Sequence, residues 1–125
     1  MQTYKQKVGA FGEKIAIDFL KKQGYQIRET NLKLRYQELD IVAFDGDDLV
    51  FVEVKTRTNT FWGEPEDALG YQKFNNIKKS IGMYLKYFQF DEKINSQVYF
   101  RFDLIAIVID KNRKTAKIRH YKELL

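Results

Sequence analysis

The stretch Leu49-Val50-Phe51-Val52-Glu53-Val54-Lys55-Thr56-Arg57 decides how this sequence folds. Successive side chains of a strand point to opposite faces, so the three valines share one face and Leu49, Phe51, Glu53 and Lys55 share the other. Apolar side chains on both faces predict a central strand that is covered on both sides. A buried carboxylate and ammonium are costly unless they are paired or bind a ligand. The simplest explanation is a structural ion pair between Glu53 and Lys55.

A second acidic strand precedes this stretch. Residues Glu38 to Phe44 alternate in the manner of a strand and include Asp40, and the segment Asp45-Gly46-Asp47-Asp48 is typical of a tight turn. An antiparallel pair joined by this turn would bring Asp40 towards Glu53. Two carboxylates and a lysine that converge on a sheet are the components of a divalent-metal site, and this hypothesis competes with the structural ion pair.

The remaining pattern predicts one α/β domain over residues 1–125, in the order αβββαββ. Apolar spacing predicts a helix from about Tyr4 to Gln23 and a second from Pro65 or Leu69 to Phe88. Further strands are expected at Tyr25–Leu34, Val98–Ile109 and Ala116–Tyr121, with a polar connection at Asp91–Gln97 and a hairpin turn at Asp110–Thr115.

The first helix carries a face of small residues. Gly9, Gly12 and Ala16 would let it lie close against a sheet, beside an apolar set made of Val8, Phe11, Ile15, Phe19 and Leu20. Glu13 falls on the shoulder of that face. The helix alone favours a solvated edge glutamate, although a carboxylate in this place can also reach an active site.

Composition sets the class of protein. The 125 residues (14.9 kDa) contain no cysteine and carry a net charge of +5 with a pI near 9.3. We therefore expect a cytoplasmic chain without disulfides, and the positive charge favours a polyanionic partner. The apolar run Leu104–Ile109 is too short to span a bilayer, so no membrane association is expected.

Two polar or aromatic features allow more than one interpretation. The pair Phe61-Trp62 in the loop Thr56–Glu66 could stack on bases, but packing of the pair against the core is the favoured interpretation. The second helix has a lysine face (Lys73, Lys78, Lys79 and Lys86), which in most proteins is simply solvated. Here no acid lies between Gly70 and Gln89, and this absence favours contact with phosphates.

The acids suit a hard cation. Mg²⁺ or Mn²⁺ takes one or two carboxylates, here from Asp40 and Glu53, and the backbone carbonyl of Val54 is a further candidate ligand. Lys55 could position water or stabilise charge on a phosphate. A zinc site has almost no ligands, because cysteine is absent and the single histidine, His120, is expected at the surface away from the acids.

The same motifs resemble a known family. The succession Gly12-Glu13, Asn31, Glu38-Leu39-Asp40, Phe51 to Arg57, Gly63-x-Pro65, Lys73 and Arg101-Phe102-Asp103 is similar to the YraN-type family of endonuclease-like proteins, which resembles the PD-(D/E)XK nucleases and archaeal Holliday-junction resolvases. The resemblance implies a restriction-endonuclease-like core, a mixed central sheet flanked by helices. It also implies a catalytic triad of Asp40, Glu53 and Lys55, with Glu13 as an accessory acid. It draws attention to Arg57, Lys73, Arg101 and Asp103 without assigning their roles.

The leading hypothesis is a metal-dependent endonuclease that hydrolyses DNA phosphodiester bonds, including those of branched or structured DNA. Candidate phosphate contacts are Arg35, Arg57, Lys73, Lys78 and Lys79. The alternatives are a non-catalytic nucleic-acid-binding module and a structural protein whose acids and lysine form a buried ion network. A symmetric homodimer would suit a two-fold junction.

Overall fold

The computed structural model describes residues 1–92, 94 and 97–125, and its elements follow the predicted order. They are α1 (Tyr4–Lys22), β1 (Gln26–Leu32), β2 (Leu39–Asp45), β3 (Asp48–Arg57), a 3-10 turn η1 (Pro65–Ala68), α2 (Tyr71–Tyr87), β4 (Phe100–Asp110) and β5 (Thr115–Tyr121). The 3-10 turn is an addition, since no separate sequence signal indicates it. Of the predicted connection Asp91–Gln97, residues 93, 95 and 96 lie outside the described residues.

The strands form one mixed sheet in the order β1-β2-β3-β4-β5. The neighbours pair antiparallel except for β3 and β4, which run parallel. Strand β3 is therefore central, as its two apolar faces predicted. The β2–β3 hairpin pairs Ile41 with Val52 and closes at Asp45 and Asp48. If the pairing is continued by one residue beyond Ile41 and Val52, Asp40 lies opposite Glu53.

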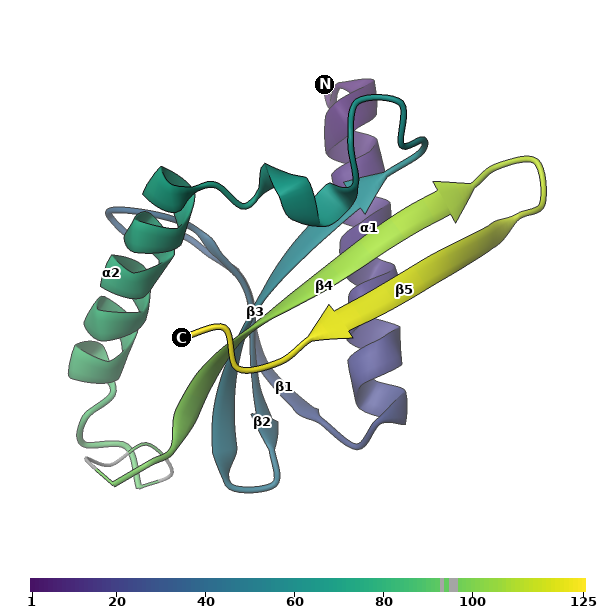
Figure 1. Cartoon of the computed structure of the whole chain (residues 1–125). Helices are drawn as coiled ribbons and strands as arrows, with labels where there is room; N and C mark the ends of the chain where they lie inside the picture. The colour runs from purple at the N-terminus through teal and green to yellow at the C-terminus, as the bar shows by residue number, and fades with distance from the viewer. Residues whose placement is uncertain (93, 95–96) are drawn as a thin grey trace.

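The two helices cover opposite faces of the sheet (Figure 1). One core cluster joins Ala16 and Leu20 of α1 to Ile41, Val50 and Ile105 of the sheet. The other joins Ile77, Ile81 and Tyr84 of α2 to Phe51 and Phe102. The α/β class and the mixed sheet flanked by helices are thus confirmed.

Helix α1 approaches β3 closely at one glycine. Its N-terminus is fixed by a capping box, in which Thr3 Oγ1 accepts from Gln6 N (3.1 Å) and Gln6 Oε1 accepts from Thr3 N (2.9 Å). A Cβ atom on Gly12 would lie 1.8 Å from Thr56 Oγ1. The predicted small face is therefore real at Gly12 and Ala16, but Gly9 is exposed. Phe11, predicted on the apolar face, is 54% exposed, because the helix turns it away from the sheet.

Neither helix has the length and apolar character needed to cross a membrane, within the described part of the chain.

Candidate active site

The hairpin register brings the two predicted acids together on the α2 side of the sheet. Asp40 and Glu53 share a side-chain hydrogen bond. The backbone N–H of Val54 donates to Asp40 Oδ2 at 2.9 Å, which fixes the orientation of that carboxyl group. Glu53 is almost fully buried. The predicted convergence of Asp40 and Glu53 is therefore present, and Val54 contacts the pair through its amide. The predicted role of the Val54 carbonyl as a metal ligand stays a prediction.

Two lysines meet the Glu53 carboxylate. Lys73 Nζ of α2 lies 2.9 Å from Glu53 Oε2, and Lys55 Nζ lies 3.8 Å from the same oxygen. Both contacts are ion pairs by distance, but Glu53 Oε2 has no well-directed hydrogen bond within the described residues. The buried oxygen thus retains a lone pair for a further ligand.

Burial and repulsion keep a proton on the acidic pair. The pKa of Asp40 is raised to about 9, first because the carboxyl group is buried and then because it hydrogen-bonds and repels Glu53; the Val54 amide acts in the opposite direction. Two carboxylates this close repel each other when both are ionised, so at neutral pH Asp40 holds a proton when no metal ion is bound, even with Lys73 and Lys55 beside the pair.

The lysines divide into two roles. Burial and a hydrogen bond with Lys73 lower the pKa of Lys55 to about 8, against the attraction of Glu53. Burial also opposes the charge on Lys73, but its bonds to Lys55 and Glu53 outweigh this and raise its pKa. Lys73 is therefore the fixed cation, and Lys55 the amine that can exchange a proton near neutral pH.

Glu13 lies near the pair without a hydrogen bond to either acid. Its pKa is raised by burial and by the charge of Glu38, while a hydrogen bond with Asn31 lowers it and Glu53 raises it further. Its Oε1 is buried and has no hydrogen-bond partner among the described residues. Glu13, Asn31 and Glu38 line a groove of about 600 Å³ between α1 and the β1–β2 connection. Glu13 is therefore half-buried at the edge of a groove, and its role as an accessory acid stays a prediction.

The candidate phosphate contacts lie on the same side as α2. Tyr36 is exposed between two cations, with Arg35 Cζ 5.6 Å and Lys79 Nζ 5.1 Å from its ring centroid. Ser80 Oγ donates to the carbonyl of Gln37 at 2.7 Å and holds this connection against α2. Lys78 is exposed, with Nζ 5.7 Å from the Phe74 ring.

The other two candidates differ from this group. Arg57 is half-buried at the end of β3, and by strand alternation it follows Glu53 and Lys55 on one face. Lys73 lies inside the acidic cluster, as described above. A phosphate contact for each of them stays a prediction.

Arg101 and Asp103 form a separate network on the α1 side. Asp103 Oδ1 lies 3.2 Å from Arg101 Nε and accepts from the Glu123 amide at 3.1 Å. Arg101 Nη2 reaches Tyr25 OH at 2.6 Å and Asp45 at 3.1 Å, and Nη1 reaches Asp48 at 3.4 Å. Burial raises the pKa of Asp103, but bonds from His120, Glu123 and Arg101 outweigh it, so the pKa is lowered. This cluster ties the strand ends and the C-terminal segment together.

His120 belongs to this network, and its predicted surface position is wrong. Its Nε2 lies 2.8 Å from Asp103 Oδ2, and its side chain is only 10% exposed. Strand β5 pairs His120 with Ile105, whose side chain faces α1. The sequence could not show this, because it depends on the β4–β5 register.

The loop aromatics also differ from the favoured interpretation. Phe61 is 89% exposed and Trp62 is 97% exposed, so neither packs against the core. Hydrogen bonds within the loop and to η1 hold its backbone instead.

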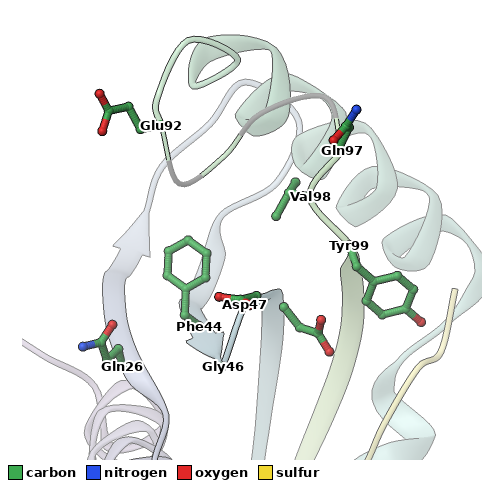
Figure 2. Close-up of a pocket in the computed structure, with 9 residues that line it drawn as sticks. Gln26, Phe44, Gly46, Asp47, Glu92, Gln97, Val98 and Tyr99 are labelled. Carbon is green, nitrogen blue, oxygen red and sulfur yellow. The ribbon is translucent and has the colours of Figure 1, made fainter.

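A hollow of about 610 Å³ lies at the opposite end of β2 and β3 from Asp40 and Glu53. Figure 2 shows its lining, with Phe44 and Gly46 of the β2–β3 hairpin facing Val98 and Tyr99 ahead of β4. No lysine or arginine lines it within the described residues, so it offers little to a phosphate.

Sequence reasoning misplaces Lys73 and does not single out Tyr36. The sequence pattern assigns Lys73 to the outer face of its helix, yet it precedes Ile77, Ile81 and Tyr84 at helical spacing and so overlies the sheet. That spacing is a usable signal. Tyr36 carries no such signal, because its position between Arg35 and Lys79 depends on the packing of the β1–β2 connection against α2.

Comparison with known proteins assigns the family. Residues 12–107 match the model of Uncharacterised protein family UPF0102. A UPF0102 protein of Caldicellulosiruptor bescii is 38% identical over 117 residues, which cover 94% of this chain and 95% of the relative. One from Clostridium botulinum strain 657 is 36% identical over 115 residues, covering 92% and 90%. The chain therefore belongs to family UPF0102, the YraN-type family.

Proposed function

We propose that this protein is a metal-dependent endonuclease that hydrolyses DNA phosphodiester bonds. The observation that carries the proposal is the Asp40–Glu53 pair, two carboxyl groups in hydrogen-bond contact with Lys55 and Lys73 beside them. A buried pair of acids that retains a proton at neutral pH is suited to exchange that proton for a cation.

The donor set fits Mg²⁺ or Mn²⁺. Among the described residues no group of three or more His, Cys, Asp or Glu side chains is arranged to hold a metal ion. Mg²⁺ does not need one, because it commonly binds one or two carboxylates and completes its shell with water and phosphate oxygens. Asp40 and Glu53 would supply the carboxylates, and the Val54 carbonyl is a further candidate. When bound, such an ion lowers the pKa of its water and polarises the phosphate.

The residues of the chain divide the remaining tasks. Lys55, with a pKa of about 8, can orient the attacking water or stabilise charge that develops on the phosphate. Lys73 fixes Glu53 and, through its hydrogen bond, holds Lys55 in place. Glu13 adds negative charge near Glu53 and would support the metal or Lys55. Arg35, Lys78 and Lys79 would hold the DNA backbone without reading its sequence.

A comparison of the Arg101–Asp103 network with the Asp40–Glu53 pair favours catalysis over a purely structural role for Asp40 and Glu53. Both oxygens of Asp103 are hydrogen-bonded, which is typical of a structural ion network. Around Glu53, by contrast, the buried Oε2 has ion pairs with Lys73 and Lys55 but no well-directed hydrogen bond within the described residues, and Asp40 keeps a raised pKa. Such incomplete compensation is common at functional sites. The alternative of a non-catalytic nucleic-acid-binding module would retain the basic surface and not require the acids.

The test compares metal binding and cleavage in matched variants. Wild type, Asp40→Asn and Glu53→Gln are titrated with Mn²⁺ by calorimetry, and each is assayed on linear, single-stranded and four-way-junction DNA. Asp47→Asn, an exposed acid in the β2–β3 turn, removes the same charge away from the site.

We expect Mn²⁺ binding to disappear in both site variants and cleavage to fall by about 100-fold or more, with Asp47→Asn like wild type. Absence of Mn²⁺ binding to wild type even with DNA present, or full cleavage by Asp40→Asn, would refute the proposal. Salt-sensitive DNA binding without metal-dependent cleavage would favour the binding module.

A further inference from the structure

The turn that follows β3 carries two consecutive aromatic residues that are almost fully exposed. Phe61 and Trp62 occupy the central positions of the turn Thr60–Gly63, whose ends are joined by a hydrogen bond from Gly63 N to Thr60 O (3.2 Å). Isolated exposed aromatic residues are common, but two adjacent and almost fully exposed ones forgo the free energy that burial would provide.

The turn is built to hold this arrangement. Asn59 Oδ1 accepts from Phe61 N at 3.2 Å on the incoming side. On the outgoing side Gly63 has a φ of +115°, which a residue with a side chain rarely adopts. Glu64 then fixes the loop to the sheet, since its N–H donates to Asp67 Oδ2 (2.9 Å) and its Oε2 accepts from Arg119 (2.7 Å). The exposure of Phe61 and Trp62 therefore follows from specific contacts at both ends of the turn.

The turn follows the strand that carries the candidate active site. Glu53, Lys55 and Arg57 alternate along one face of β3, and the chain passes from Arg57 into the loop. Figure 1 shows this loop leading from the end of β3 into η1. A polyanion held at Lys55 and Arg57 would therefore continue towards the turn.

We propose that Phe61 and Trp62 form a stacking platform for bases of an unpaired DNA strand. Bases have apolar π-faces that are free only where a strand is unpaired, and aromatic side chains beside a basic groove are the usual receptors for them. The platform would give the enzyme a preference for DNA with single-stranded segments. This inference rests on the proposed function, because it names the form of substrate that the same site receives.

Charge decides between a nucleic acid and a second protein as the occupant. The chain has a net charge of +5, and Lys55 and Arg57 lie on the strand leading to the turn. Of the acids that follow the turn, Glu64 and Glu66 are paired with Arg119. A second copy of this chain would bring the same positive charges to the interface, whereas a DNA strand would neutralise them. Self-association through the turn is therefore the competing outcome of the test.

The test uses the single tryptophan of the chain, so that emission reports on position 62 alone. Wild-type protein is titrated with a twelve-residue oligothymidine strand and, separately, with a blunt duplex of the same length, in low salt with EDTA. Affinities of Phe61→Leu and Trp62→Leu are measured by anisotropy of labelled DNA. Phe90→Leu is the matched control, since Phe90 is 91% exposed beyond the far end of α2.

We expect the single strand to quench Trp62 emission, and each turn variant to lose about tenfold in affinity for the single strand. Affinity for the blunt duplex should change less than twofold, and Phe90→Leu should resemble wild type. Unchanged emission, or equal single-strand affinity of wild type and both turn variants, would refute the platform. A wild-type dimer without DNA that becomes monomeric in Trp62→Leu would refute it in favour of self-association.

The cleavage assay separates this inference from the proposed function. Metal-dependent cleavage by the turn variants with wild-type affinity for single strands would refute the platform and leave the endonuclease standing. Stacking without cleavage by any variant would refute the endonuclease and leave a single-strand-binding surface.

Discussion

At the scale of single residues, Asp40 links folding to pH and to metal binding. In the unfolded chain its carboxyl group releases a proton near the ordinary aspartate pKa of 3.8, whereas in the fold its pKa is about 9. Between these values the folded protein holds a proton that the unfolded chain has lost. The free energy of unfolding therefore falls as pH rises through this window. Lys55, whose pKa is lowered to about 8, acts in the opposite direction only above that pH.

We predict that metal-free wild type loses stability relative to Asp40→Asn between about pH 5 and pH 8, by up to about 4 kcal/mol, since each pH unit in this window contributes about 1.4 kcal/mol. The asparagine has no proton to lose, so its dependence on pH should be flatter. Urea denaturation at several pH values measures the difference. Saturating Mn²⁺ should stabilise wild type near pH 8 and leave the variant unchanged. Parallel stability curves for the two proteins would contradict this account.

At the scale of elements, the close packing of α1 against β3 depends on the absence of a side chain at Gly12. A Cβ atom at Gly12 would meet Thr56 Oγ1 at 1.8 Å and Thr56 Cβ at 2.7 Å, whereas one at Gly9 would meet nothing within 4 Å. The helix carries Glu13 on its next residue. A shift of α1 away from the sheet would therefore move Glu13 away from Glu53.

We predict that Gly12→Ala lowers the free energy of unfolding by about 1–3 kcal/mol, because the added methyl group overpacks the interface. Gly9→Ala, on the exposed side of the same helix, should be neutral or stabilising by up to about 1 kcal/mol through helix propensity. Thermal or urea denaturation of both variants gives the comparison. Adding Thr56→Ala to Gly12→Ala should restore part of the loss. Equal stability of the two alanine variants would show that the helix can move at no cost.

The elements also show how far the sequence determines the structure. The β2–β3 hairpin follows from strand alternation and an Asp-Gly turn, and these two signals are enough to bring Asp40 towards Glu53. Both acids lie in one local unit, so a short segment contains the information. Local patterns misplace Lys73 and His120 because their partners, Glu53 and Asp103, lie on other elements. Such contacts depend on how helices and strands pack, which local patterns do not specify.

At the scale of the whole molecule, positive charge is distributed over more than one surface. Lys78 and Lys79 are exposed on α2, beside Arg35 and Tyr36. Lys21 and Lys22 are exposed in the last turn of α1, on the other side of the sheet. The acids of the candidate site lie on the α2 side of the sheet, so we expect a DNA backbone bound there to meet the first pair and not the second.

We predict that Lys78→Gln/Lys79→Gln weakens binding to a DNA duplex by about tenfold at low salt and lowers the dependence of affinity on salt. Lys21→Gln/Lys22→Gln removes the same charge and should weaken binding less than twofold. Fluorescence anisotropy at several salt concentrations measures both effects. Equal losses in the two double variants would mean that net charge, and not the α2 surface, governs association.

The parallel pairing of β3 with β4 has a consequence for how the protein folds. Its partners, such as Leu49 and Phe100, lie roughly fifty residues apart in the chain, whereas β2 and β3 are joined by a tight turn. Closing the long crossover costs more chain entropy than closing the hairpin, so we expect it to limit the folding rate. Asp40 and Glu53 would then meet early, before α2 brings Lys73 over them. During that interval the two acids would lack their fixed cation, and dissolved divalent ions could speed folding by neutralising them.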